Sequence, residues 1–332
     1  MTDTATPLLE LKNLQCLFPM RRSVNDLVRG QHHYVHAVDE VSFEIGRGEI
    51  VALVGESGCG KSTLGRMLVK LQETTGGQII FDGQDVTGIG GNELKQFRRR
   101  AQIVFQNPFE AFDPRLTVGD SLQEALRIHN IGTKDDREAR IIEVMERSGL
   151  SPARAFLARF PHELSGGQSQ RIATVRAMLL SPQFMVADEP VSMLDVSVRA
   201  DILNQLLDLR EQTGMSIVFI THDLSVARYI ADRIAVMYLG MFVELGEADQ
   251  VISDPKHPYS RALLSNTLPV GDEVRPGEPL EIGGEVPTPV DVKPGCRFAN
   301  RCPFVFDRCR QETPQLLAQP DGTAVACHLF TP

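Results

Sequence analysis

The sequence has no long apolar run, no secretory signal and no excess of positive charge. None of its apolar stretches approaches the roughly eighteen residues that a membrane-spanning helix needs. The first residues do not show a basic segment followed by an apolar one, as a secretory signal would. The 34 Lys and Arg residues are outnumbered by 43 Asp and Glu, for a net charge of −9. These absences predict a cytosolic protein without an electrostatic grip on nucleic acid.

The sequence also contains no low-complexity tract and no internal repeat. Hydrophobic residues make up 42% of it and charged residues 23%, which is typical of a folded globular protein and not of a disordered one. Its 332 residues are about twice the usual length of one domain. We therefore expect one large domain with an appendage, or two domains.

Short apolar runs alternate with longer amphipathic stretches over the first 265 residues, which indicates strands and helices around a buried sheet. Strands are predicted at residues 8–17, 50–54, 78–81, 101–105, 184–187 and 216–220. Helices are predicted at 61–71, 166–180, 198–211 and 224–231. Residues 108–181 lack strand patterns, which predicts a helical insert within an α/β core, and the polar residues 19–33 are predicted to be an inserted loop.

A glycine-rich turn follows the predicted strand at 50–54 and opens a predicted helix. Its sequence GESGCGKS matches the phosphate-binding pattern GxxxxGK[ST]. Glycines let backbone amides approach phosphate oxygens, Lys61 would neutralise the β and γ phosphates of ATP, and Ser62 would ligate Mg²⁺. The predicted ATP-binding residues here are Gly55, Glu56, Ser57, Gly58, Cys59, Gly60, Lys61, Ser62 and Thr63.

Two carboxylates end the predicted strand at 184–187. Open α/β sheets bind their ligands at the carboxyl ends of strands, so this position suits a metal and a reacting phosphate. Asp188 is predicted to hold Mg²⁺, and Glu189 to act as the base that polarises the attacking water. A polar turn that merely caps a buried strand is the alternative interpretation, and the presence of Lys61 weakens it.

The segment Leu164-Ser-Gly-Gly-Gln168, followed by an amphipathic helix, forms a second amide-rich helix start. With the glycine turn and the acidic strand, it resembles the ATP-binding cassette (ABC) ATPases. The resemblance implies a P-loop NTPase fold, with a RecA-like core, a helical subdomain at about 107–182 and an antiparallel β subdomain. It also implies that a partner subunit's ATP site is completed in trans by Ser165, Gly166, Gly167 and Gln168.

Other positions match the family motifs one by one. Gln106 resembles the glutamine that touches Mg²⁺ and couples the insert to membrane subunits, and Asp195 the acidic residue that communicates across the dimer. His222 resembles the histidine that contacts the γ phosphate. Phe18 is favoured over Tyr34 as the ring that stacks on adenine, although either could be core packing.

The resemblance implies a motor that works as a pair. No arginine finger is identifiable, so negative charge on the γ phosphate would be neutralised by Lys61, His222, Mg²⁺ and amides from across an interface. ATP would join two subunits and hydrolysis would separate them. The expected partners are a homologous ABC ATPase subunit, in a heterodimer or a homodimer, and two transmembrane permease subunits.

The last part of the chain is rich in proline and cysteine. Ten of the 20 prolines fall in residues 266–332, which predicts a loop-rich tail that needs a staple. Four of the six cysteines crowd this tail, and disulfides are disfavoured in a reducing compartment. Four thiolates can hold zinc or an iron–sulfur cluster, and the x5 and x6 gaps lack the C-x2-C pairs common in zinc modules. These thiols belong to Cys296, Cys302, Cys309 and Cys327.

The segments around His257-Pro-Tyr and Gly295-Cys-Arg-Phe resemble the C-terminal extension of dipeptide and oligopeptide importer ATPases. That resemblance implies a [4Fe-4S] cluster on the four thiols, with Zn²⁺ as the alternative. It divides the chain into a nucleotide-binding domain, 1–265, and an extension, 266–332. It also implies a peripheral protein at the cytoplasmic face of the inner membrane, indirectly served by an extracytoplasmic solute-binding protein. Members of this family transport peptides, nickel, glutathione and some sugars, so the resemblance does not identify the transported solute.

Two other classes fit less well. A soluble cassette ATPase that acts on DNA or ribosomes would be expected to have two cassettes, a long coiled-coil insert or a basic surface, and the sequence has none of these. A redox or iron-sensing module, in which the cysteine-rich tail is the active part, would be distinguished by iron and sulfide analysis.

Overall fold

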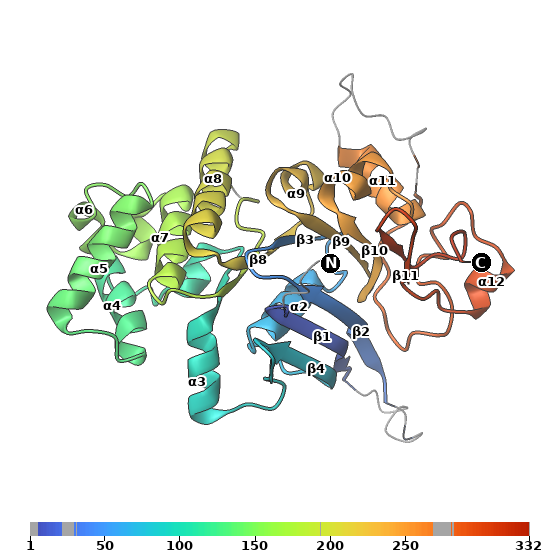
Figure 1. The fold of residues 1–332 in the computed structure, drawn as a ribbon, viewed down its shortest axis with the longest axis horizontal. Helices are drawn as coiled ribbons and strands as arrows, with labels where there is room; N and C mark the ends of the chain where they lie inside the picture. The colour runs from blue at the N-terminus through green and yellow to red at the C-terminus, as the bar shows by residue number, and fades with distance from the viewer. Residues whose placement is uncertain are drawn as a thin grey trace. The chain divides into compact units, whose positions relative to one another are not determined.

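The computed structural model describes residues 6–21, 30, 32–192, 194–267, 280 and 282–331. The loop predicted at 19–33 therefore falls largely outside the described residues. The fold divides into two compact units: the first comprises Met1–Met67, Leu71–Thr87 and Phe219–Pro332, and the second Leu68–Lys70 and Gly88–Val218. Each unit is α/β (Figure 1).

The first unit contains an antiparallel sheet with the strand order β2-β1-β4-β5. Its strands are β1 (Leu9–Pro19), β2 (Tyr34–Ile45), β4 (Gly76–Phe81) and β5 (Gln84–Asp85). Leu9, Leu11, Leu14 and Cys16 of β1 are buried between more exposed neighbours, an alternation that leaves one face for the core. Figure 1 shows β1, β2 and β4 side by side.

The second sheet of this unit runs in the order β11-β12-β10-β9-β3-β8. Strand β3 is parallel to β9, and every residue of β3 is buried, as expected for a strand covered on both faces. The bounds are β3 (Ile50–Val54), β8 (Ser216–Thr221), β9 (Arg233–Tyr238) and β10 (Met241–Glu247). The helices are α2 (Lys61–Leu68), α9 (Leu224–Ile230), α10 (Ala248–Ser253) and α11 (Pro258–Thr267).

The C-terminal extension is built into the first unit. Its elements are α12 (Asp307–Gln311), β11 (Leu317–Ala318) and β12 (Ala324–Val325), and β12 pairs with β10. Phe298 is 1% exposed and lies within 5.5 Å of the rings of Tyr238 and Tyr259, measured between centroids. Strand pairing and ring packing therefore hold the extension in addition to any staple at its thiols.

The second unit contains the parallel strands β6 (Ala101–Val104) and β7 (Phe184–Asp188), and the first residues of β8. Its other elements are helical: α3 (Gly91–Arg100), α4 (Val118–Ile128), α5 (Lys134–Arg147), α6 (Arg154–Leu157), α7 (Gly166–Met178), α8 (Val196–Thr213) and the 3-10 turns Pro108–Ala111 and Pro161–Glu163. Every helix or strand element described between residues 108 and 181 is an α-helix or a 3-10 turn, as the missing strand pattern predicts for this segment.

Candidate functional site

The glycine turn lies between β3 and α2 in the first unit. A Cβ atom at Gly55 would lie 2.3 Å from the carbonyl oxygen of Met237, and one at Gly60 would lie 2.1 Å from that of Ala37. Both distances are shorter than any real contact, so the neighbouring backbone excludes every other residue from these two positions. The turn therefore packs tightly against the backbone at Met237 and Ala37. It leads into the start of α2, and the backbone amides at a helix start suit a phosphate group.

Lys61 is 5% exposed and lies over this turn. Its Nζ donates to the carbonyl oxygens of Gly55, at 2.7 Å, and Glu56, at 2.9 Å. Burial raises the pKa of the adjacent Cys59 thiol, which therefore stays neutral and leaves the ammonium charge uncancelled. The loop backbone and Lys61 together fit a phosphate group, as the sequence predicts.

Glu56 lies in the same turn but is engaged by protein groups. Its backbone N–H donates to the Tyr259 hydroxyl at 2.8 Å, and its carboxylate accepts two bonds from Arg301 of the extension, at 2.7 and 3.0 Å. Sequence analysis missed Tyr259 and Arg301. Tyr259 and Arg301 lie 203 and 245 positions from Glu56 in the sequence, so no local pattern could have indicated these contacts.

The acidic pair lies at the end of β7 in the second unit. Asp188 is 4% exposed, and Glu189 has φ of 44°, a left-handed conformation that is uncommon for a residue with a side chain. The amide Nε2 of Gln106 donates to Oε2 of Glu189 at 2.9 Å. The structure therefore brings together Gln106 and Glu189, two residues that the sequence assigned to one site, 83 positions apart.

The turn that precedes α7 is exposed at its tip. The Ser165 hydroxyl accepts from the backbone N–H of Gln168, and the Gln168 side chain accepts from the backbone N–H of Ser165, which makes a capping box. Ser165 and Gly166 are exposed, and Gly167 is half-buried with room for no Cβ, since one would lie 2.8 Å from Val198. The cap uses Ser165 locally and leaves the glycine backbone at the surface.

Ser62 and Thr63 are half-buried in the first turn of α2, and four other predicted residues lie at the surface. Asp195, the residue before α8, and His222, after β8, are both exposed. The two candidate stacking rings are 38% exposed for Phe18 and 37% for Tyr34, and they occupy adjacent register positions of β1 and β2. The geometry does not separate the two rings.

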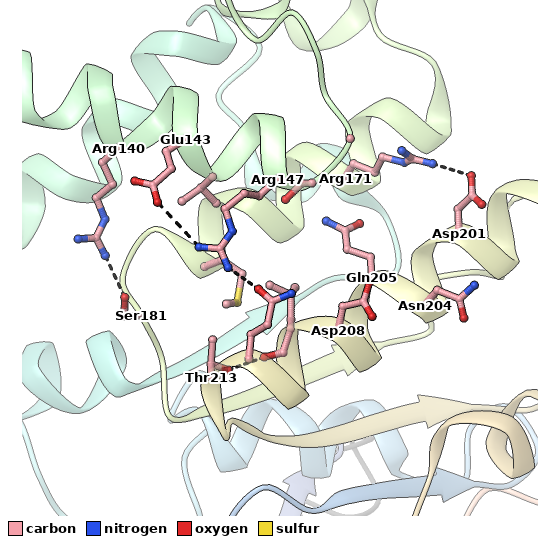
Figure 2. Close-up of a pocket in the computed structure, with 16 residues that line it drawn as sticks. Arg140, Glu143, Arg147, Arg171, Ser181, Asp201, Asn204, Gln205, Asp208 and Thr213 are labelled. Atoms are coloured by element: carbon pink, nitrogen blue, oxygen red, sulfur yellow. Dashed lines mark hydrogen bonds and ion pairs between the residues drawn. The ribbon is translucent and has the colours of Figure 1, made fainter.

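A cavity of about 630 Å³ lies elsewhere in the second unit, among α5, α7 and α8 (Figure 2). Figure 2 shows Arg140 directed at Ser181 and Arg171 directed at Asp201. Arg147 donates to the side-chain oxygen of Gln212. The cavity is lined by none of the residues that the sequence assigned to nucleotide binding.

The four cysteines of the extension are free thiols. Among the residues described, no group of three or more His, Cys, Asp or Glu side chains is placed to hold a metal ion. Burial raises the pKa of Cys296 to about 12, and the thiols of Cys327, Cys309 and Cys302 add to that effect. Cys309 and Cys327 are buried, and Cys296 and Cys302 are half-buried.

These features define a protein that binds a nucleoside triphosphate on an α/β fold, and comparison with known proteins identifies its family. Residues 38–192 match the family model described as ABC transporter, and residues 243–309 match the oligopeptide/dipeptide transporter C-terminal region. A dimeric ATP-binding cassette solved with bound ADP and phosphate has a TM-score of 0.64 and 28% identity, over 72% of this chain and 98% of that one. A second dimeric structure of a bacterial ABC transporter cassette has the same score and 29% identity.

Curated relatives extend this match over nearly the whole chain. A probable peptide ABC transporter ATP-binding protein of Sinorhizobium fredii is 46% identical over 90% of this chain and 84% of its own length. A dipeptide transport ATP-binding protein of Haemophilus influenzae is 43% identical over 97% and 96%, and an oligopeptide transport ATP-binding protein of Bacillus subtilis is 42% identical over 98% and 98%. The chain belongs to the ABC transporter ATPases, in the group that carries the oligopeptide/dipeptide C-terminal region.

Proposed function

We propose that this chain is the ATP-hydrolysing subunit of an importer of dipeptides or oligopeptides. The names of the relatives and the match to the oligopeptide/dipeptide transporter C-terminal region support the peptide class, and relatives named as peptide import ATP-binding proteins support an importer. The observation that carries the catalytic assignment is the hydrogen bond from Gln106 to Glu189, because it orients a carboxylate at the end of β7 beside the buried Asp188.

In this proposal Lys61 and the turn amides bind the triphosphate, and Ser62, Gln106 and Asp188 hold Mg²⁺. Bound Mg²⁺ would supply positive charge that offsets the charge developing on the phosphate oxygens. Glu189 accepts a proton from the attacking water, while its bond to Gln106 fixes which carboxylate oxygen faces the reaction. His222 stabilises the γ phosphate. Phe18, or Tyr34, stacks on the adenine.

The proposal includes a second ATPase subunit. Ser165, Gly166, Gly167 and Gln168 would complete the partner's nucleotide site, and the exposure of Ser165 and Gly166 supports that role. Asp195 would lie at the same interface. No helix among the described residues is long and apolar enough to cross a membrane. In the proposed transporter two permease subunits would provide the pore, with this chain bound at the cytoplasmic face and an external binding protein delivering the solute.

We also propose that the extension holds a [4Fe-4S] cluster on Cys296, Cys302, Cys309 and Cys327. The four cysteines fall within one short segment, and the match of the chain to the oligopeptide/dipeptide transporter C-terminal region supports this assignment. Anaerobic purification should yield about four iron and four sulfide per chain. Stoichiometric zinc without iron would replace this assignment.

The activity is tested by Glu189→Gln in the complex with its permeases and partner subunit. Loss of the base should reduce turnover about a hundredfold or more while ATP binding remains, so that a nucleotide-bound dimer accumulates. Glu143→Gln is the matched control, because this exposed carboxylate on α5 pairs with Arg147, away from the residues assigned to hydrolysis, and should leave turnover unchanged. Near-normal turnover in Glu189→Gln would show that the base is another residue.

A further inference from the structure

One side chain of the extension reaches the phosphate-binding turn. Arg301 is 7% exposed as a side chain, and its two terminal nitrogens donate to the two carboxylate oxygens of Glu56, at 2.7 and 3.0 Å. Its third nitrogen, Nε, donates to the carbonyl oxygen of Gly283 at 3.2 Å, and its guanidinium lies 5.9 Å from the centre of the Tyr238 ring. The guanidinium is therefore fixed in a fork that matches a carboxylate.

Glu56 is held from three directions by groups of the same unit. Arg301 binds its carboxylate, the Tyr259 hydroxyl accepts its backbone N–H at 2.8 Å, and Lys61 donates to its carbonyl oxygen at 2.9 Å. Tyr259 is fully buried, with its ring 4.7 Å from that of Tyr238. The position of the Glu56 backbone therefore depends on the aromatic core and on Arg301, and it helps to determine where the Lys61 ammonium lies.

The support for Tyr259 comes partly from the extension as well. Phe298 of the extension packs against Tyr238 and Tyr259, at 5.3 and 5.5 Å between ring centres, and it lies three residues before Arg301. The backbone N–H of Arg301 donates to the Phe298 carbonyl oxygen at 2.9 Å, which fixes the two residues relative to each other. One short segment of the extension thus supports the phosphate-binding turn by packing and by charge.

We propose that Arg301 is a positioning residue for ATP binding: the extension uses it to hold the phosphate-binding turn in its receptive conformation. This proposal rests on the proposed function, since it assigns ATP as the ligand of that turn. Among the described residues, the side-chain contacts of Arg301 are with Glu56, Gly283 and Tyr238, none of which is assigned to hydrolysis, so it acts on the affinity for nucleotide and not on the chemical step. Removing it leaves a carboxylate without its partner beside the turn, which favours other backbone positions.

Arg301→Gln in the full chain, within its complex, tests the proposal. We expect the KM for ATP and the Kd for Mg-ADP to rise about tenfold, with kcat within about twofold of the native value, where tenfold corresponds to about 1.4 kcal/mol. Arg301→Lys keeps the charge but loses the fork, and should fall between the two. The control Asp321→Asn breaks the pair with Lys256, which also joins the extension to the rest of the unit but touches no residue of the turn.

Comparison with Glu56→Gln separates positioning from a general loss of structure. The double variant should bind nucleotide about as weakly as either single variant, because both remove the same contact. An unchanged Kd in Arg301→Gln, or an equal rise in Asp321→Asn, would overturn the proposal. If instead the native chain neither binds nor hydrolyses ATP, the proposed function fails and not this assignment alone.

Discussion

The phosphate-binding turn and the turn before α7 are both glycine-rich helix starts, yet they differ in how far the rest of the chain buries and contacts them. The first is enclosed: two of its glycines contact neighbouring backbone, Lys61 is buried, and Glu56 is held by Tyr259 and Arg301. The second is held by its own capping box, and its tip is exposed. A turn that is completed within one chain suits a ligand bound there, whereas an exposed turn suits a group supplied from outside.

Lys61→Ala should have the largest effect, because it removes the one ammonium of the enclosed turn. Loss of a charge-assisted contact to phosphate should weaken ATP binding by about a hundredfold or more, at about 1.4 kcal/mol for each factor of ten. Equilibrium binding of a fluorescent ATP analogue measures this directly. Lys134→Ala, at the start of α5, is a control of equal charge change, and native-like affinity in Lys61→Ala would contradict the assignment of the turn.

Gly166→Asp tests the exposed turn. A Cβ at Gly166 would lie 3.7 Å from its nearest neighbour, Leu194, so the chain itself has room for the change. Aspartate is also favourable in the first turn of a helix. The isolated subunit should therefore have the same unfolding temperature as the native chain and bind nucleotide with the same affinity. Turnover in the complex should fall by about tenfold or more, because the new negative charge faces the phosphates of the bound nucleotide.

Gly166→Asn is the neutral control of nearly equal size, and it should lose less activity than Gly166→Asp. The contrast between the two turns would break down if Gly166→Asp weakened nucleotide binding by the isolated subunit. It would equally break down if turnover in the complex did not change.

The same contrast explains which parts of the fold could be predicted from the sequence. The strand at 50–54 and the helix starting at Lys61 were confirmed because the local pattern and the motif chemistry coincide there. The helix at 166–180 begins at the predicted residue, Gly166, and ends two residues early, where its last turn becomes irregular. Local signals therefore located both turns.

Contacts between distant segments could not be predicted in this way. Strand β2 alternates buried and exposed residues, but its partners lie in β1 and no nearby motif marks it. The extension was expected to depend on a staple, yet β12 pairs with β10 and Phe298 is buried, because tertiary pairing supplies order that its prolines do not predict. The hydrogen bonds between Arg301 and Glu56 are also contacts between distant segments, which no local pattern predicts.

The last prediction concerns the acid stability of the core beneath the phosphate-binding turn. His257 is buried, and burial lowers its pKa to about 3, while its Nδ1 accepts the backbone N–H of Tyr259. The unfolded chain binds a proton near pH 6.5, so the stability from a neutral His257 is complete above that pH and is lost as pH falls toward about 3. At pH 5 the loss should be about 2 kcal/mol, from 1.36 kcal/mol for each pH unit.

Urea unfolding of the native chain and of His257→Gln at pH 7.5 and pH 5.0 isolates this contribution. Gln can still accept the N–H of Tyr259 but does not titrate, so its stability should fall less on acidification. Burial raises the pKa of the neighbouring Glu244, which opposes the effect in the same range, but Glu244 is present in both proteins and its contribution cancels in the difference. Equal losses in the two proteins would mean that His257 is protonated in the folded state. In that case the core beneath Tyr259 would be open to water, and the enclosed turn would resemble the exposed one more closely than the structure indicates.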